Sequence, residues 1–188
     1  GTGTQTAQLS CGGEPPPGSP TQVNSTEEYD GTNWTNGGNL PAAKRSNATF
    51  GTQTSAVSAA GLTTNPGVMF TTSEEYDGSS WTSGGTVGTG RNSHSASGTL
   101  TAGLIFGGST GPGNPGRSDA TEEYDGTSFT AGGSLSTARS VLSGSPNGTQ
   151  TASYATAGIG VPGFIAETEE YNGTSWSDGG DINTTREQ

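Results

Sequence analysis

An aromatic pair returns along this chain at a nearly constant interval, and this periodicity constrains the fold more than any other feature. Four tyrosines are separated by 47, 48 and 47 residues, and a tryptophan or phenylalanine follows each of them by five positions. Self-similarity at a fixed period is the signature of repeat architectures, in which successive units stack on one another. The pairs are Tyr29 and Trp34, Tyr76 and Trp81, Tyr124 and Phe129, and Tyr171 and Trp176.

The unit around each pair reads Glu-Glu-Tyr-Asp/Asn-Gly, then the second aromatic residue, then two glycines, and an arginine follows further on. We assign the recurring arginine to Arg45, Arg91, Arg139 and Arg186. Four such units account for the whole chain, at approximately 1–44, 45–90, 91–138 and 139–188. The sequence therefore predicts a single repeat domain.

The composition excludes one compact hydrophobic core. Only 26% of the residues are hydrophobic, whereas an ordinary globular domain has about 45–50%. Taken alone, this composition and the net charge would indicate a disordered linker. A disordered segment has no reason to return an aromatic pair in phase four times, so we expect a folded unit that buries area between stacked sheets.

Within a unit the period is two, which is typical of strands. We read 98–108 as one strand that ends at a double glycine, and we expect a further strand to start near each arginine, as in 91–97. The Asp-Gly turn in 122–129 predicts a hairpin, and a four-residue loop would place the two aromatic residues opposite each other. Each unit is then four short strands without a helix, and the chain is expected to open in the second strand of a unit.

Four strands in about 47 residues is typical of a β-propeller blade. The units resemble the kelch repeat in the apolar residues before Gly107 and Gly108, the Tyr-Asp and Trp across a hairpin, and the arginine before the innermost strand. The Glu-Glu-Tyr-Asp/Asn-Gly-Thr-Ser-Trp pattern is similar to kelch-like proteins of marine bacteriophages and bacteria, which are mostly structural or tail-associated. The resemblance implies an all-β kelch-like β-propeller with four four-stranded blades, alone or within a larger ring that further units or neighbouring chains complete.

The charge of the chain limits its partners. With 17 acidic and 6 basic residues the net charge is −11, so most of the surface would repel a phosphate backbone or an anionic bilayer. No apolar stretch approaches the length of about 20 residues that a membrane helix needs. We therefore expect neither nucleic acid binding nor membrane insertion.

The acidic residues of each hairpin allow two interpretations. Clustered carboxylates could hold calcium, which prefers several oxygen ligands. Alternatively, because adjacent residues of a strand point to opposite faces, one glutamate of each pair forms a structural ion pair with the recurring arginine. We prefer the structural interpretation and expect no cofactor, with calcium as the alternative.

The sequence offers little for catalysis, and we expect no enzymatic activity. The single histidine, His94, is the only candidate base for a nucleophilic triad, and the assigned repeat equivalents Ala48 and Leu142 indicate a packing position. The single cysteine, Cys11, aligns with small or apolar strand residues and cannot form an internal disulfide. A sialidase-type site would depend on Tyr154, the only tyrosine outside the repeated pairs.

The segments that differ between units are 14–25, 62–73, 109–121 and 159–168. Alternating strand directions would place them on one face, where loops held by a scaffold carry recognition, and Arg117 is a candidate ligand-binding residue there. The resemblance then implies a non-enzymatic binding or structural module of a phage virion: a fibre, tail or decoration protein, in an oligomer or larger assembly, whose partners are other virion proteins or a host surface glycan. The alternatives are a bacterial extracellular adhesin or lectin at the cell surface, and a propeller enzyme of sialidase or lyase type.

Overall fold

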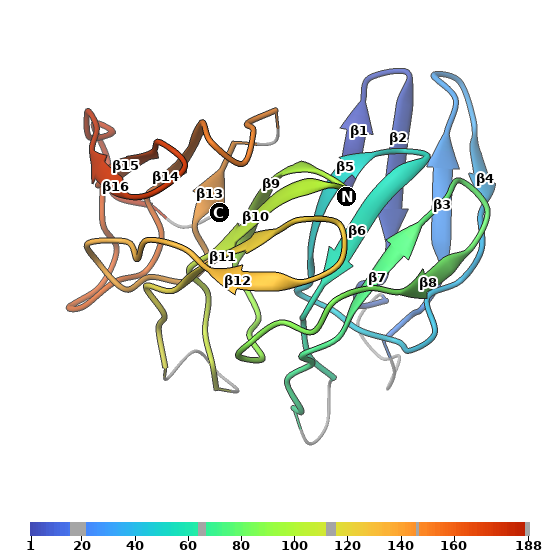
Figure 1. The fold of residues 1–188 in the computed structure, drawn as a ribbon, viewed down its shortest axis with the longest axis horizontal. Coiled ribbons are helices and arrows are strands. Elements are labelled where there is room, and N and C mark those ends of the chain that lie inside the picture. The colour runs from blue at the N-terminus through green and yellow to red at the C-terminus, as the bar shows by residue number, and fades with distance from the viewer. Residues whose placement is uncertain (16–21, 64–66, 112–115, 146, 187–188) are drawn as a thin grey trace.

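The computed structural model describes residues 1–15, 22–63, 67–111, 116–145 and 147–186. These residues form four antiparallel sheets of four strands each and contain no helix. Each sheet comes from one continuous stretch of chain, and its strands pair in chain order (Figure 1). The prediction of an all-β, propeller-like architecture with four four-stranded blades is confirmed.

We number the sheets as blades 1 to 4 in chain order. Blade 1 contains β1 (Thr2–Thr4), β2 (Ala7–Cys11), β3 (Thr26–Tyr29) and β4 (Trp34–Asn36). Blade 2 contains β5 (Ala48–Thr52), β6 (Ser55–Ala59), β7 (Ser73–Tyr76) and β8 (Trp81–Ser83). Blade 3 contains β9 (Ser95–Thr99), β10 (Ala102–Phe106), β11 (Thr121–Tyr124) and β12 (Phe129–Ala131). Blade 4 contains β13 (Ser143–Gly144), β14 (Ser153–Thr156), β15 (Thr168–Tyr171) and β16 (Trp176–Asp178).

The blades follow one another around an arc, with blade 1 at one end and blade 4 at the other (Figure 1). The first strand of each blade lies on the inner side, where β5 neighbours β1 and β9, and β9 neighbours β13. The second, third and fourth strands follow outward in order. This arrangement places the turn between the third and fourth strands at one end of each blade and the loop between the second and third strands at the other.

The segment 98–108 is not one strand, which corrects the sequence prediction. A tight turn divides it into the end of β9 and the whole of β10, and Gly98 enters that turn with φ at 103°. A Cβ atom on Gly98 would overlap the carbonyl oxygen of Ala102, so the hairpin requires glycine. The equivalent Gly3 lies in β1, so the chain opens in the inner strand of blade 1 and not, as expected, in a second strand.

The hairpin between the third and fourth strands has the predicted four-residue loop. Tyr76 lies directly opposite Trp81, with ring centroids 4.9 Å apart, and the other three aromatic pairs have the same register. Asp77 closes the loop because its carboxylate accepts hydrogen bonds from the backbone N–H groups of Ser79 and Ser80, both at 2.8 Å. These hydrogen bonds lower the pKa of Asp77 to about 2. The turn therefore accounts for the recurring Asp-Gly.

The hydrophobic core is divided between the blades. One buried cluster lies between blades 1 and 2, a second between blades 2 and 3, and a third between blades 3 and 4, around Leu9, Val57 and Leu104 respectively. Each cluster includes the tyrosine of the following blade: Tyr76, Tyr124 or Tyr171. This division explains how a chain with few large apolar residues folds.

None of the described residues belongs to a helix long and apolar enough to cross a membrane.

Candidate functional site

In blades 1, 2 and 3, the second glutamate of the Glu-Glu pair ties its blade to the next one. The hydroxyl of Tyr76 donates a hydrogen bond to Glu28 at 2.5 Å, and that of Tyr171 donates to Glu123 at 2.6 Å. Tyr124 donates to Glu75 in the same way. Burial, followed by the hydrogen bond to the glutamate, raises the pKa of Tyr76, Tyr124 and Tyr171 to about 12. All three phenols are therefore neutral donors at physiological pH.

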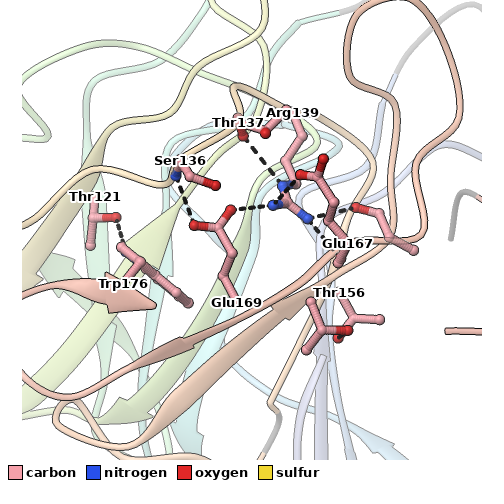
Figure 2. Close-up of polar contacts among 10 residues, drawn as sticks. Thr121, Ser136, Thr137, Arg139, Thr156, Glu167, Glu169 and Trp176 are labelled. Atoms are coloured by element: carbon pink, nitrogen blue, oxygen red, sulfur yellow. Dashed lines mark hydrogen bonds and ion pairs between the residues drawn. The ribbon is translucent and has the colours of Figure 1, made fainter. Parts of the chain in front are cut away.

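In blades 2, 3 and 4, the first glutamate of the Glu-Glu pair forms a buried ion pair with a cation that precedes the first strand of the same blade. Figure 2 shows Arg139, which precedes β13, with its guanidinium on Glu169 of β15. The same guanidinium donates to the backbone carbonyl of Glu167 at 2.9 Å, while the backbone N–H of Ser136 donates to Glu169 at 2.7 Å. Arg91 and Glu122 repeat the ion pair at 2.6 Å in blade 3. The pair thus fastens the linker that joins each blade to the one before it.

The recurring cation of blade 2 is Lys44 and not Arg45, which corrects the sequence assignment. Lys44 contacts Glu74 at 2.5 Å with no exposed side-chain surface, and it precedes Arg91 by the repeat interval of 47 residues. Arg45 is 31% exposed and lies 3.7 Å from Glu14. By the same shift, the repeat equivalent of His94 is Asn47 and not Ala48.

The fourth recurring cation, Arg186, is exposed. Its Nε donates to the backbone carbonyl of Thr184 at 3.4 Å, as Arg91 donates to Thr89 and Arg139 to Thr137. Arg186 therefore shares a local backbone contact with the two buried arginines, although it belongs to no ion pair among the described residues.

The inner strands line an open axial cavity of about 410 Å³. Its lining is dominated by small residues of all four blades, with Gly1, Thr49, Ala96 and Gly144 at equivalent positions. A shallower hollow beside it is bounded by Ser46, Asn47, Ser93, His94, Val141 and Leu142. Small side chains leave this axis open for a ligand or a partner segment without supplying a charged group to hold one.

The backbone around that hollow is held in an unusual conformation. Ser46, Ser93 and Val141 have φ values of 53°, 52° and 53°, which non-glycine residues rarely adopt. The N–H of Ser93 donates to the carbonyl of Ser46 at 3.2 Å, and the N–H of Val141 donates to the carbonyl of Ser93 at 2.9 Å. This chain of hydrogen bonds links three consecutive blades next to the axis and offsets the cost of the left-handed conformation.

His94 is 8% exposed and packs beside the axis. Burial, followed by the nearby positive charge of Arg91, lowers its pKa to about 3. The imidazole is therefore uncharged at neutral pH, and its low pKa makes it unsuited to donate or accept a catalytic proton there. Its place among equivalents Asn47 and Leu142 fits the expected packing position.

The segments that differ between units emerge from three equivalent sets of isolated β-bridges. These sets are Arg45–Leu62–Met69, Asn92–Ser109–Arg117 and Ser140–Ile159–Phe164. They extend the first three strands of blades 2, 3 and 4 at the same end (lower side of Figure 1). We call the described residues of 14–25, 62–73, 109–121 and 159–168 the loop face. Parts of three of these segments, including half of the proline-rich one, lie outside the described residues.

The loop face exposes apolar side chains that the sequence analysis did not select. Val68, Phe164 and Val161 are 54%, 56% and 78% exposed. Arg117 lies at the base of its segment and is partly buried. The sequence could have indicated these residues, because each is an apolar residue in a Gly- and Pro-rich segment and a loop needs no such residue to form its turns. The loop face therefore combines exposed apolar groups with a cation.

The two remaining residues selected from the sequence, Cys11 and Tyr154, lie on the second strands of their blades. Cys11 is buried between blades 1 and 2, and this burial raises the pKa of its thiol. Tyr154 occupies the position of Leu9, Val57 and Leu104 on the side of blade 4 that faces away from blade 3. Among the residues described, no three His, Cys, Asp or Glu side chains group closely enough to hold a metal ion.

Comparison of the sequence with models of known protein families gives no match. Comparison with curated proteins also gives no significant match.

Proposed function

We propose that this protein is a non-enzymatic binding module in which kelch-like blades act as a rigid scaffold for the loop face. The observation that carries the proposal is that three segments of different sequence emerge from equivalent β-bridges at one end of the blades. Loops that are variable and held by a rigid scaffold are the usual carriers of recognition. The opposite end carries the nearly invariant Asp-Gly turns, which are explained by backbone hydrogen bonds alone.

The chemistry of the loop face favours a host surface glycan or another virion protein as its partner. Phe164 and Val68 supply exposed apolar side chains on the segments of blades 4 and 2, and protein interfaces are enriched in aromatic residues. Arg117 adds a hydrogen-bonding fork suited to carboxylate or hydroxyl groups. Together with the resemblance of the repeat to structural and tail-associated proteins of phages, these groups support a place in a virion fibre, tail or decoration.

A glycan array probed with the purified chain tests the binding function. We expect Phe164→Ser and Arg117→Ala each to weaken glycan binding by about tenfold or more, which corresponds to about 1.4 kcal/mol. Thr127→Ala, in the exposed turn at the opposite end of blade 3, is the control and should leave binding unchanged. Full binding by both loop-face variants, at unchanged melting temperature, would contradict the assignment of the loop face.

The biological setting needs a separate measurement. Immunodetection of the chain in purified phage particles supports the virion assignment, whereas detection only in a bacterial cell-surface fraction supports the adhesin alternative. If the chain hydrolyses a sialoside and Tyr154→Phe abolishes this activity, the protein is an enzyme, and both the virion and the adhesin assignments are wrong.

A further inference from the structure

The face of the blade 1 sheet that points away from blade 2 exposes residues whose equivalents are buried or partly buried in the other blades. Trp34 is 47% exposed, whereas its equivalent Trp81 is 8% exposed. Glu27 is exposed although its equivalents Glu74, Glu122 and Glu169 are buried. Blade 1 therefore presents the same side that blades 2, 3 and 4 bury against a preceding blade, without a blade against it.

The face of the blade 4 sheet that points away from blade 3 is also exposed. Tyr154 is 41% exposed, whereas Leu9, Val57 and Leu104 at the same position are completely buried. Ile182 is partly exposed, whereas its equivalents Leu40, Val87 and Leu135 are at most 3% exposed. Blade 4 therefore presents the side that blades 1, 2 and 3 bury against a following blade.

The exposed polar residues of the two sides match the contacts that recur at the internal interfaces. Each internal interface has a tyrosine hydroxyl that donates to the second glutamate of the preceding blade. By repeat position, Tyr29 on blade 1 matches the tyrosine donors and Glu170 on blade 4 matches the glutamate acceptors, and neither side chain has a hydrogen-bond partner among the described residues. Glu170 is exposed, whereas its equivalents Glu28, Glu75 and Glu123, which each accept a tyrosine hydroxyl, are partly buried.

A second recurring contact joins the tryptophan to the preceding blade. Trp81 donates from its indole nitrogen to the hydroxyl of Thr26 at 2.9 Å, and Trp176 donates to Thr121 at the same distance (Figure 2). On the two uncovered faces, the corresponding residues are Trp34 on blade 1 and Thr168 on blade 4. The space around two equivalent glycines also shows that blade 4 has no following blade against it. A Cβ atom on Gly133 would overlap the backbone oxygen of Thr174 in the next blade, whereas one on Gly180 would meet nothing within 4 Å.

The third recurring contact is the ion pair between a linker cation and the first glutamate of the following blade. On blade 1 this glutamate is Glu27, and the matching cation, one repeat after Arg139, is Arg186 at the other end of the arc. The carbonyl of Arg186 already accepts a hydrogen bond from Gly158 at 2.8 Å, as Arg139 does from Gly108 and Arg91 from Gly61. Its backbone is therefore placed as in the completed interfaces.

We propose that a second copy of this chain docks through its blade 1 onto blade 4 of the first, and that Arg186, Glu170 and Thr168 of one copy contact Glu27, Tyr29 and Trp34 of the other. Such a head-to-tail contact joins two different sides, so it either closes a ring or continues as a chain of copies. The net charge of −11 opposes association, which makes moderate salt the suitable condition because salt screens this repulsion. The inference does not depend on the proposed binding function.

Charge reversal tests the contact. We expect sedimentation velocity of the wild-type chain in about 0.15 M salt to show a mass that rises with protein concentration up to about 1 mM, the scale of a weak contact. Glu27→Arg and Arg186→Glu should each remain monomeric, because each places like charges in the contact. An equimolar mixture of the two variants should associate again, since each docking then joins one arginine to one glutamate.

The mixture separates loss of the contact from loss of the fold, because two misfolded variants cannot restore each other. Glu14→Gln, an exposed charge on the loop face, is the control and should associate like the wild type. A wild-type chain that stays monomeric throughout this concentration range, or a mixture that stays monomeric while the wild type associates, overturns the proposal.

Discussion

The hydroxyl of Tyr171 in blade 4 donates a hydrogen bond of 2.6 Å to Glu123 in blade 3, and this contact makes the stability of the fold sensitive to alkaline pH. Burial and the glutamate raise the pKa of Tyr171, Tyr76 and Tyr124 to about 12 from an ordinary value of 10. The folded chain therefore holds these protons more tightly than the unfolded chain. Stability is fully present below pH 10 and is lost as the pH rises towards 12.

We predict that the urea midpoint falls between pH 10 and pH 12, together with the appearance of tyrosinate absorbance. Tyr171→Phe should lower the free energy of unfolding at pH 7 by about 1–2 kcal/mol, because it leaves Glu123 without its donor. The same variant should also have a weaker pH dependence, since one of the three buried phenols is gone. An equal fall of the midpoint in the wild type and in Tyr171→Phe would argue against this origin.

Arg139→Met should be strongly destabilising. It removes the cation from a completely buried pair and leaves Glu169 charged with only the backbone N–H of Ser136 as a donor, and breaking a buried ion pair typically costs about 3–5 kcal/mol. We expect a lower midpoint in chemical denaturation, and a smaller decrease for Arg139→Lys because Lys44 occupies the equivalent position in blade 2. Arg186→Met is the matched control: it changes the same repeat position where the side chain is exposed, so a monomeric sample should keep its midpoint.

Gly133→Ala should destabilise the chain by about 1–3 kcal/mol, the range for overpacking. Its new methyl group would overlap the backbone of the turn at Thr174 and force blades 3 and 4 apart. The matched variant Gly180→Ala places the same group where no atom lies within 4 Å. Thermal unfolding of both variants measures this effect. Equal melting temperatures would mean that Gly133, the second of the two glycines after the aromatic residue, does not control the distance between the blades.

His94 should make the chain sensitive to acid. Its pKa is lowered from 6.5 to about 3, chiefly by burial, so the unfolded chain binds the proton more readily than the folded one. The contribution of His94 to stability is complete above pH 6.5 and is lost as the pH falls towards 3. His94→Leu, which introduces the residue found at Leu142, should flatten the decrease between pH 6 and pH 4 in urea denaturation. The same slope in variant and wild type would assign the acid sensitivity to other groups.

The sequence predicted the features that depend on neighbouring residues in a hairpin. Tyr76 opposite Trp81 follows from the four-residue Asp-Gly loop, because the loop length fixes the register. The turn after Gly98 was missed because Thr99 and Leu100 have strand-forming character, and only the positive φ of Gly98 in the structure shows the reversal. Arg45 was selected over Lys44 because it matches the arginine of the other units, although the interval of 47 residues favours the lysine.

The contacts between blades could not be predicted in the same way. That Glu75 binds a tyrosine of the next unit, while Glu74 binds a lysine before its own unit, depends on the side of the blade that each carboxylate faces and on the position of the neighbouring blade. The pattern of two adjacent glutamates indicates opposite sides, but it does not identify the partners. Likewise, the exposure of Phe164 depends on how its segment leaves the bridge to Ile159.

The two adjacent glutamates also bear on how such a chain can change its length. Each unit carries the carboxylate for the following unit and the phenol for the preceding one. Duplication or loss of one whole unit in the gene would therefore bring together ends that already fit, whereas a break inside a unit would separate them. Recombination at the linkers could enlarge or shorten the array while leaving every junction chemically intact.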